Sequence, residues 1–169
     1  YSVEDDLPKA EEYWNKALKK DILNLGKNDK HISYVLGLIY SNGFLVDESI
    51  ADMKTWFDNS IKLGCQLPNI ELGYYHYQLA MEGEEKNFDK EFDKAIECFL
   101  AAGKGGLVQG YLSLGQICLD EEDYDKAEEY FKKALPHSDA NLGLGLIHFG
   151  DENFVKAEEY FLKSYESKN

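Results

Sequence analysis

The most regular feature of the sequence is a pattern of small and aromatic residues that recurs five times. Each copy has a small or slim residue, an aromatic residue four positions later, and alanine or serine seven positions later. The copies are Ala10/Trp14/Ala17, Met53/Phe57/Ser60, Ala95/Phe99/Ala102, Ala127/Phe131/Ala134 and Ala157/Phe161/Ser164. Positions i, i+4 and i+7 lie on one face of an α-helix. Each copy therefore predicts an amphipathic helix with an aromatic side chain between two small ones.

A Leu-Gly pair precedes each of the last four copies. The pairs are Leu36-Gly37, Leu72-Gly73, Leu114-Gly115 and Leu144-Gly145. Glycine inside a helix costs about 1 kcal/mol relative to alanine, so its recurrence in one register indicates that a second helix approaches closely there. Each unit is therefore expected to be a helical hairpin, in which helix A carries the glycine and helix B carries the aromatic residue.

With Leu-Gly on helix A and Ala, Phe and Ala on helix B, the units resemble the tetratricopeptide repeat. Between Gly37 and Gly64, the sequence Leu-Gly-x-x-Tyr-x-x-Gly, then Asp47, Trp56 and Phe57, is more similar to the Sel-one-like variant of that repeat. The intervals between the paired glycines are 36, 42 and 30 residues, whereas a regular tetratricopeptide array repeats every 34 residues or so. The resemblance implies an all-α fold, an α-solenoid with a right-handed superhelix, that binds other proteins and performs no chemistry of its own.

The repeats are expected to form a single domain over residues 1–169, with about four helix-turn-helix units and an extra B-type helix at the N-terminal end. The expected units are 8–25, which is partial, and 30–64, 66–104, 107–136 and 138–167. The extra helix should span Pro8 to Lys20, with Asp5 or Asp6 as its cap. An insertion around Glu82 to Phe92, with its near-duplicate Asn87 to Lys94, is expected to lengthen the turn between two helices.

The last expected helix, Val155 to Tyr165, is again of type B. Solenoids need polar end surfaces for solubility, so an uncapped apolar end would allow self-association.

Charge and composition limit the classes of molecule that the chain is expected to bind. The chain has 18 basic residues, all of them lysine, and 32 acidic ones, so its formal charge is −14. That charge would repel phosphate, which argues against binding to nucleic acid or to an anionic membrane and favours a basic protein partner. The absence of arginine excludes mechanisms that need a rigid bidentate donor. The longest apolar runs are too short to span a bilayer.

The three cysteines, Cys65, Cys98 and Cys118, are an odd number without CxxC spacing. They indicate free thiols rather than a disulfide framework or a zinc site. Because Cys98 and Cys118 fall on inward-facing helix positions, we expect them to be buried, and a reducing, cytoplasmic compartment fits them best. The sequence starts at Tyr1 rather than methionine, so a removed secretion signal stays open as an alternative.

No pattern in the sequence supports catalysis, a cofactor or a metal. There is no Gly-x-Ser-x-Gly, His-Glu-x-x-His or phosphate-loop motif. The glycine-rich stretch from Ala102 to Gly106 is interpreted as a helix stop, since no strand precedes it. The histidines are expected to pack or face solvent; they are His31, His76, His137 and His148. The chain is thus predicted to be non-enzymatic, with a catalytic domain outside residues 1–169 as the open alternative.

A binding groove is expected on the concave face, which the A helices line. Residues three before, one after and four after each paired glycine should face it, with a few polar residues near its rim. The set is Tyr34, Leu38, Ser41, Ile70, Tyr74, Tyr77, Leu112, Gln116, Leu119, Leu142, Leu146 and Phe149, with Asn42, Gln78 and Asp120 near the rim. The leucines are equally consistent with packing against a neighbouring repeat, whereas the tyrosines suit a binding surface. Tyr34, Leu38 and Asn42 depart from the Lys and Asn with which tetratricopeptide domains clamp acidic chaperone tails.

Acidic residues gather in the turns between helices A and B. The acidic edge comprises Asp47, Asp120, Glu121, Glu122, Asp123 and Asp151. The run from Asp120 to Asp125 lacks the residue order of a calcium loop. Its carboxylates are expected to complement the N-terminus of the following helix, or to attract a basic partner.

Together these patterns predict a non-enzymatic module that binds a peptide, a helix or a protein in its concave groove. The alternative is an acidic immunity or inhibitor protein that neutralises a basic toxin or nuclease.

Overall fold

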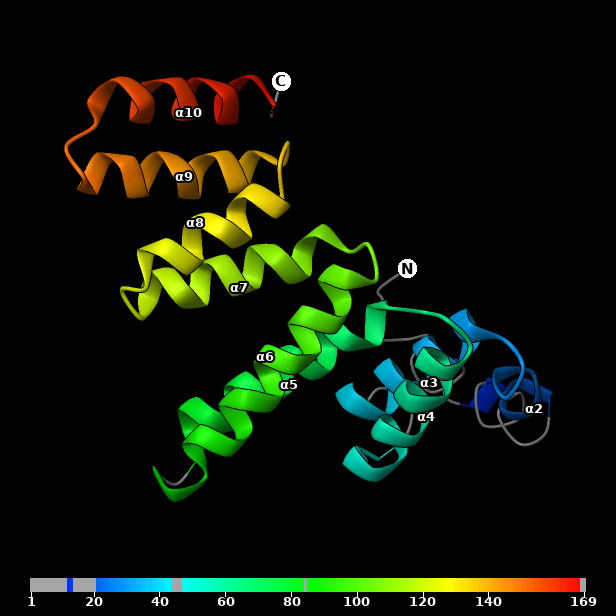
Figure 1. Cartoon of the computed structure of the whole chain (residues 1–169). Helices are drawn as coiled ribbons and strands as arrows, with labels where there is room; N and C mark the ends of the chain where they lie inside the picture. Colours follow the sequence, from blue (N-terminus) through cyan, green and yellow to red (C-terminus); the bar gives the residue numbers. More distant parts are fainter. Residues whose placement is uncertain (1–11, 14–20, 44–46, 84, 168–169) are drawn as a thin grey trace, which may run out of the picture. The chain divides into compact units, whose positions relative to one another are not determined.

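The described part of the chain is built from helices. The computed structural model describes residues 12–13, 21–43, 47–83 and 85–167, and no strand occurs among them. The helices are α2 (Leu23–Gly26), α3 (Lys30–Asn42), α4 (Ile50–Lys62), α5 (Leu67–Glu82), the 3-10 helix η3 (Glu85–Asn87), α6 (Phe88–Lys104), α7 (Val108–Asp120), α8 (Tyr124–Lys133), α9 (Ser138–Gly150) and α10 (Phe154–Glu166). Figure 1 shows their order along the chain, and the predicted all-α fold of helix-turn-helix units is confirmed.

The chain divides into two compact units, Tyr1–Pro68 and Asn69–Asn169. The predicted single domain over residues 1–169 stays a prediction. The expected N-terminal helix from Pro8 to Lys20, and its caps at Asp5 or Asp6, lie outside the described residues except for Glu12 and Tyr13.

The first unit contains the hairpin of α3 and α4 and the short α2. Asp29 caps α3 by accepting hydrogen bonds from the backbone N–H groups of His31 and Ile32 at 2.8 and 3.0 Å, and these bonds lower the pKa of its carboxyl group. On α4, the Asn59 side-chain amide donates to the Gly26 carbonyl at 3.0 Å and so fastens α4 to the end of α2. The unit therefore combines an apolar core with polar ties at the helix ends.

The Leu-Gly glycines pack directly beneath the aromatic residues of their partner helices. A Cβ on Gly73 would lie 2.6 Å from the Phe99 ring, and one on Gly115 would lie 2.7 Å from the Phe131 ring. The same overlap would occur between Gly37 and Phe57, and between Gly145 and Phe161. Real Cβ atoms do not approach this closely, so the predicted packing reason for glycine is confirmed in all four hairpins.

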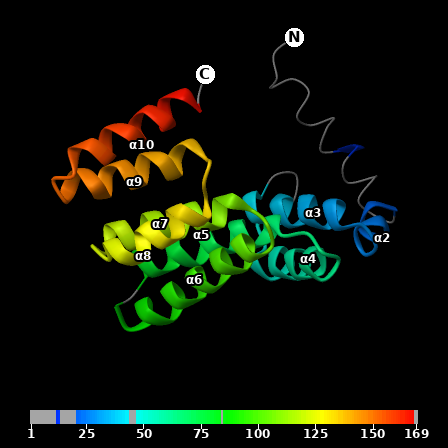
Figure 2. The ribbon, with the colours of Figure 1, turned by 45° about the horizontal axis from the view of Figure 1, so that its top comes forward.

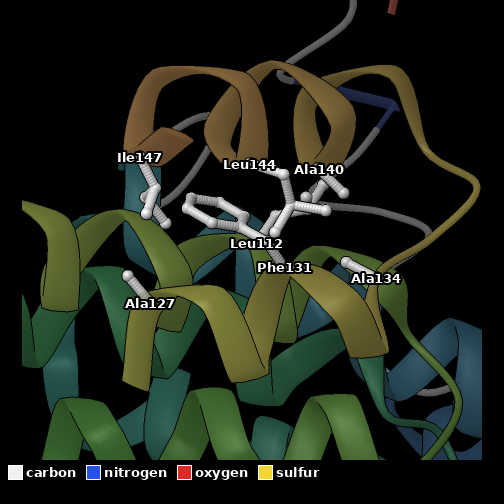
Figure 3. Close-up of a cluster of buried hydrophobic side chains, with 7 residues drawn as sticks. All are labelled: Leu112, Ala127, Phe131, Ala134, Ala140, Leu144 and Ile147. Atoms are coloured by element: carbon white, nitrogen blue, oxygen red, sulfur yellow. The ribbon is translucent and has the colours of Figure 1, made fainter. Parts of the chain in front are cut away.

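The second unit stacks α5 to α10 as successive hairpins, and α9 and α10 lie side by side in both Figure 1 and Figure 2. Its C-terminal core gathers around Phe131 of α8. Figure 3 shows this ring under α9, among Leu112, Leu144 and Ile147. Because α9 covers α8, the aromatic residue of one hairpin also holds the next hairpin in place.

Two kinds of turn recur in the array. Between helices A and B, Glu122 and Glu152 adopt φ angles of 60° and 57°, in the left-handed region that glycine prefers. Between helices B and A, Gly64 and Gly106 occupy that region with φ of 89° and 93°. Gly106 follows the end of α6, which confirms the interpretation of Ala102 to Gly106 as a helix stop.

One acidic turn residue, Asp123, lies at the N-terminus of the following helix as expected, whereas other residue types cap the helices after the corresponding turns. Asp123 caps α8 by accepting from the backbone N–H of Lys126 at 3.2 Å. The corresponding caps of α4 and α10 are Ser49 and Asn153, not Asp47 or Asp151. A short side chain directly before the helix reaches the free N–H groups, whereas the earlier aspartates of these turns do not.

The prediction that the insertion lengthens a turn is right only in part, because most of the insertion lengthens the helices. α5 and α6 have 16 and 17 residues, against 13 in α7 and 10 in α8. Phe88 and Phe92 lie one turn apart on α6 and stack with ring centroids 5.2 Å apart, and acidic residues in the first turn favour a helix N-terminus. The repeated Phe-Asp-Lys sequence is thus a helix-forming pattern.

The cysteines are free, as expected, but only Cys65 is fully buried, whereas Cys98 and Cys118 are half-buried. Burial raises the pKa of each of these two half-buried thiols. Within the described residues, no helix is long and apolar enough to cross a bilayer.

Candidate protein-binding groove

A groove of about 410 Å³ runs across the A helices α5, α7 and α9 of the second unit. Its lining is mostly apolar and aromatic, with amides and hydroxyl groups between the rings. The lining residues are Tyr74, Tyr77, Phe99, Gln109, Leu112, Ser113, Gln116, Ile117, Asp120, Phe131, Asp139, Leu142, Gly143 and Leu146. Such a mixture can bury apolar side chains of a ligand and satisfy its polar backbone.

Several residues of the predicted groove line this hollow together. They are Tyr74, Tyr77, Leu112, Gln116, Leu142 and Leu146, along with the rim residue Asp120. Leu142 and Leu146 remain 40% and 46% exposed on α9. The equivalent position to Leu142 on α7 is Leu112, which is only 6% exposed because it packs into the core around Phe131.

Four predicted groove residues of the second unit lie outside this lining. Ile70 and Leu119 pack against the cores around Phe99 and Phe131, respectively. Gln78 donates a hydrogen bond to Glu82 one turn along α5, at 3.1 Å. Phe149 is exposed and contacts Phe154 edge to face, with centroids 5.6 Å apart. The positions chosen relative to each paired glycine thus include residues that pack into the cores instead of lining the groove.

Four predicted groove residues belong to the first unit. Tyr34 is half-buried and stacks on Phe57 at 6.0 Å between centroids. Leu38 and Ser41 are also half-buried, and Asn42 donates its side-chain amide to the Leu38 carbonyl at 3.0 Å. These side chains are engaged within α3 and its hairpin.

The sequence reasoning missed polar members of the groove. Gln109 and Asp139 lie six positions before the paired glycines of α7 and α9, and Ser113 and Gly143 lie two before them. Extending the same register by one helical turn toward the N-terminus would have found Gln109 and Asp139.

Tyr74 is held at the centre of the groove by contacts on three sides. Its hydroxyl group lies 3.0 Å from the Ser113 Oγ and accepts a hydrogen bond from the Gln109 amide at 3.2 Å. Its ring meets Phe99 edge to face, 5.0 Å between centroids. A ring that is oriented before binding loses little conformational entropy when a ligand packs on it.

The charged members of the lining are both acidic, namely Asp120 and Asp139. Gln116 donates its side-chain amide to Asp120 at 2.8 Å, which orients the carboxylate at the C-terminal end of α7. Burial, followed by the negative charges of Asp120 and Glu121, raises the pKa of Tyr77 in the same part of the groove. The electrostatic environment at this end of the groove is negative.

A second, polar hollow of about 550 Å³ contains most of the acidic edge. We call it the acidic hollow; its lining is Glu121, Glu122, Asp123, Tyr124, Asp125, Glu128, Ile147, His148 and Asp151. Lys126 pairs with Asp123 at 2.6 Å and lowers the pKa of that carboxyl group. Asp47 belongs to the first unit and is exposed there.

Lysines of helices α8 and α10 pair with glutamates one turn earlier on the same helix. Lys132 and Lys133 pair with Glu128 and Glu129 at 2.8 and 2.6 Å, and Lys163 pairs with Glu159 at 2.6 Å. These lysines are therefore paired within their own helices, and no lysine lines the groove. Among the described residues, no group of three His, Cys, Asp or Glu side chains is arranged to hold a metal ion.

Comparisons with known proteins agree with this architecture. The profile of the tetratricopeptide repeat matches residues 108–135, which contain α7 and α8. A search of curated protein sequences finds no significant match.

Solved structures share the fold over nearly the whole chain. A protective antigen present in uropathogenic Escherichia coli strains, which displays an SLR fold, aligns with a TM-score of 0.65 at 22% identity. The alignment covers 99% of this chain but 35% of the antigen, so the chain spans about a third of that protein. A Sel1 repeat protein from Oxalobacter formigenes aligns with a TM-score of 0.65 at 18% identity, over 96% of this chain and 72% of that one.

MamA aligns with a TM-score of 0.59 at 22% identity, covering 98% of this chain and 91% of its own. The glycine-on-aromatic hairpins, the matched repeat profile and these folds agree with one another. Residues 108–135 therefore match the tetratricopeptide repeat, and the chain shares the helical-repeat fold of SLR and Sel1 repeat proteins.

Proposed function

We propose that the chain is a non-enzymatic protein-binding module whose groove on α5, α7 and α9 holds a peptide or helical segment of a partner protein. The observation that carries this proposal is that exposed leucines and an oriented tyrosine share one hollow: Leu142, Leu146 and Tyr74 line the same groove of about 410 Å³. Exposed apolar side chains gathered in a concave site are a common mark of protein recognition. The repeat fold supports the same function.

The test is a selection of random displayed peptides on the whole chain, followed by binding measurements on two variants. Leu142→Ser with Leu146→Ser removes the apolar side of the groove. Val155→Ser with Leu162→Ser is the matched control, since these α10 residues are 81% and 54% exposed and lie outside the groove. We expect selected peptides to lose about tenfold or more in affinity for the groove variant and little for the control.

Equal losses in both variants, or no selected peptide at all, would show that the groove is not a binding site. Circular dichroism of both variants checks that the helices remain folded.

The alternative function, inhibition of a basic toxin or nuclease, is supported by the acidic hollow next to the same helices. An inhibitor of this kind should bind one folded basic protein tightly, with association that slows steeply as salt rises. A peptide-binding module should recover short segments at micromolar affinity in the selection. Recovery of a single folded partner by pull-down and mass spectrometry, with no short binder, would favour the inhibitor.

A further inference from the structure

The groove and the acidic hollow meet at the C-terminal end of α7. Asp120 lines the groove and the next residue, Glu121, lines the hollow. Ser113, beside the tyrosine at the groove centre, is seven positions before Asp120, which corresponds to roughly 10 Å along the helix axis. A ligand of modest length can therefore contact the apolar lining and the acidic residues together.

The acidic hollow carries more negative charge than the neighbouring lysines neutralise. Lys126 and Lys132 pair with Asp123 and Glu128. The remaining four carboxylates have no ion-pair partner within the described residues; they are Glu121, Glu122, Asp125 and Asp151. Like charges held in one hollow repel one another, and a cation placed among them relieves this repulsion.

The junction itself offers a cation both a carboxylate and an aromatic ring. The Gln116 amide occupies Oδ1 of Asp120 and leaves the rest of this carboxylate open to the groove. Tyr77 lines the same stretch, and its raised pKa reflects burial first and then the charges of Asp120 and Glu121. Lysine and arginine side chains bind favourably where a carboxylate lies beside the face of an aromatic ring.

We propose that the segment bound in the groove carries apolar side chains followed, about 10 Å further on, by two or more lysine or arginine residues. The apolar part packs on Tyr74, Leu142 and Leu146, and the basic part lies over Asp120 and the acidic hollow. This inference rests on the proposed function of the groove and adds the chemical class of the partner. Its basis is charge complementarity, because the lining of both hollows contains carboxylates and no lysine.

The experiment uses the full chain and three short fluorescent peptides, each made in both orders of its two halves. The first joins a half rich in leucine and tyrosine to a run of lysines. In the second the lysines are replaced by glutamates, and in the third the apolar residues are replaced by serines. Fluorescence anisotropy at low and high NaCl gives the affinities. We expect the first peptide to bind about tenfold or more tightly than either of the others, and to weaken as salt rises.

Two charge-removing variants then test which carboxylates bind the lysines of the first peptide. Asp120→Asn with Glu121→Gln should weaken the first peptide by about tenfold. Glu97→Gln with Glu158→Gln removes the same number of charges from exposed helix positions outside both hollows and should change its affinity little. Equal binding of the glutamate peptide, equal binding of the serine peptide, or equal losses in the two variants would each overturn the inference.

Failure of the inference and failure of the proposed function give different results. If selected peptides bind the groove without preference for basic residues, the groove remains the binding site and its proposed partner class is wrong. If neither selected nor designed peptides depend on Leu142 and Leu146, the groove itself is wrong.

Discussion

Helices α8 and α10 have nearly the same sequence but different surroundings. Both contain Lys-Ala-Glu-Glu-Tyr-Phe, and in both the phenylalanine packs on the paired glycine of its own helix A. Phe131 of α8 is also pressed against Gly143 of α9 and is 3% exposed. Phe161 of α10 is half-buried, because among the described helices only α9 makes extensive contact with α10.

The same sequence pattern therefore has two structural roles. It builds the hairpin through the aromatic ring and its glycine, and it joins hairpins when a further helix covers the opposite side of the ring. Local properties of α8 and α10 should thus respond equally to mutation, whereas properties that depend on the covering helix should respond unequally.

The largest difference is expected for removal of the two rings. Phe131→Ala should destabilise the protein by about 3–5 kcal/mol, because it leaves a cavity between α7, α8 and α9. Phe161→Ala should cost about 1–2 kcal/mol, because part of that ring is already exposed to solvent. Urea unfolding followed by circular dichroism measures both, and Phe→Leu at each position serves if the first alanine variant does not fold. Similar losses at the two positions would contradict the comparison.

Alanine at the paired glycines should also destabilise the two hairpins unequally, with a smaller difference in the free energy of unfolding. Gly115→Ala pushes a methyl group into Phe131, which Gly143 holds from the other side, so we expect a loss of about 1–3 kcal/mol. Gly145→Ala pushes Phe161, which can shift toward solvent, so the loss should be about 1 kcal/mol or less. Thermal unfolding of the two variants against the parent chain gives the order, and a larger loss for Gly145→Ala would be inconsistent with an open outer side of α10.

The turns that precede α8 and α10 should behave alike, because their strain is local. Glu122 and Glu152 both have φ near 60°. Glycine at either position should therefore stabilise the protein by about 0.5–1 kcal/mol. Glu→Ala at each position controls for the loss of charge, since alanine shares the strain. Stabilisation by alanine equal to that by glycine would mean that repulsion in the turn, rather than backbone conformation, sets the effect.

A small pH effect should distinguish the helices at the position after the shared alanine. Lys132 lies four residues after Glu128 and lowers the pKa of its carboxyl group, with a further contribution from His148. At the equivalent site of α10, Leu162 follows Glu158. Because the folded-state pKa of Glu128 is depressed, its stabilising contribution is present above about pH 4.5 and is lost as pH falls through the lower folded value.

Glu128→Gln should therefore reduce the free energy of unfolding at pH 7 by a few tenths to about 1 kcal/mol and make unfolding less sensitive to acid below pH 4.5 or so. Glu158→Gln is the matched variant and should leave the pH profile nearly unchanged. Urea titrations at several pH values measure both. Parallel pH profiles for the parent chain and Glu128→Gln would exclude this pair as a source of acid sensitivity.

The helical hairpins were predictable because their signals are local in sequence. The spacing of Ala127, Phe131 and Ala134, together with Gly115, predicts that α7 packs on α8. The structure confirms this packing. The insertion was predicted only in part, because a repeated Phe-Asp-Lys sequence suits a turn by composition, whereas the stacking of Phe88 on Phe92 gives it a helical face.

The groove was only partly predictable for a different reason. Leu112 and Leu142 occupy the same register, yet one is buried and the other is 40% exposed. Their difference comes from which helix covers each one, and this depends on contacts between hairpins. Gln109 and Tyr74, which meet in the groove, are separated by 35 residues, and no periodicity within either helix indicates their hydrogen bond.

The sequence alone was sufficient for the helix type, the hairpin partners and the glycine under each aromatic ring, because helix periodicity and close packing act between positions with fixed spacing. The tertiary structure was needed to show that α5, α7 and α9 enclose a groove, that Asp120 joins it to the acidic hollow, and that Phe131 and Phe161 differ in burial. These properties depend on how successive hairpins cover one another, and the side chains of one hairpin do not specify that arrangement.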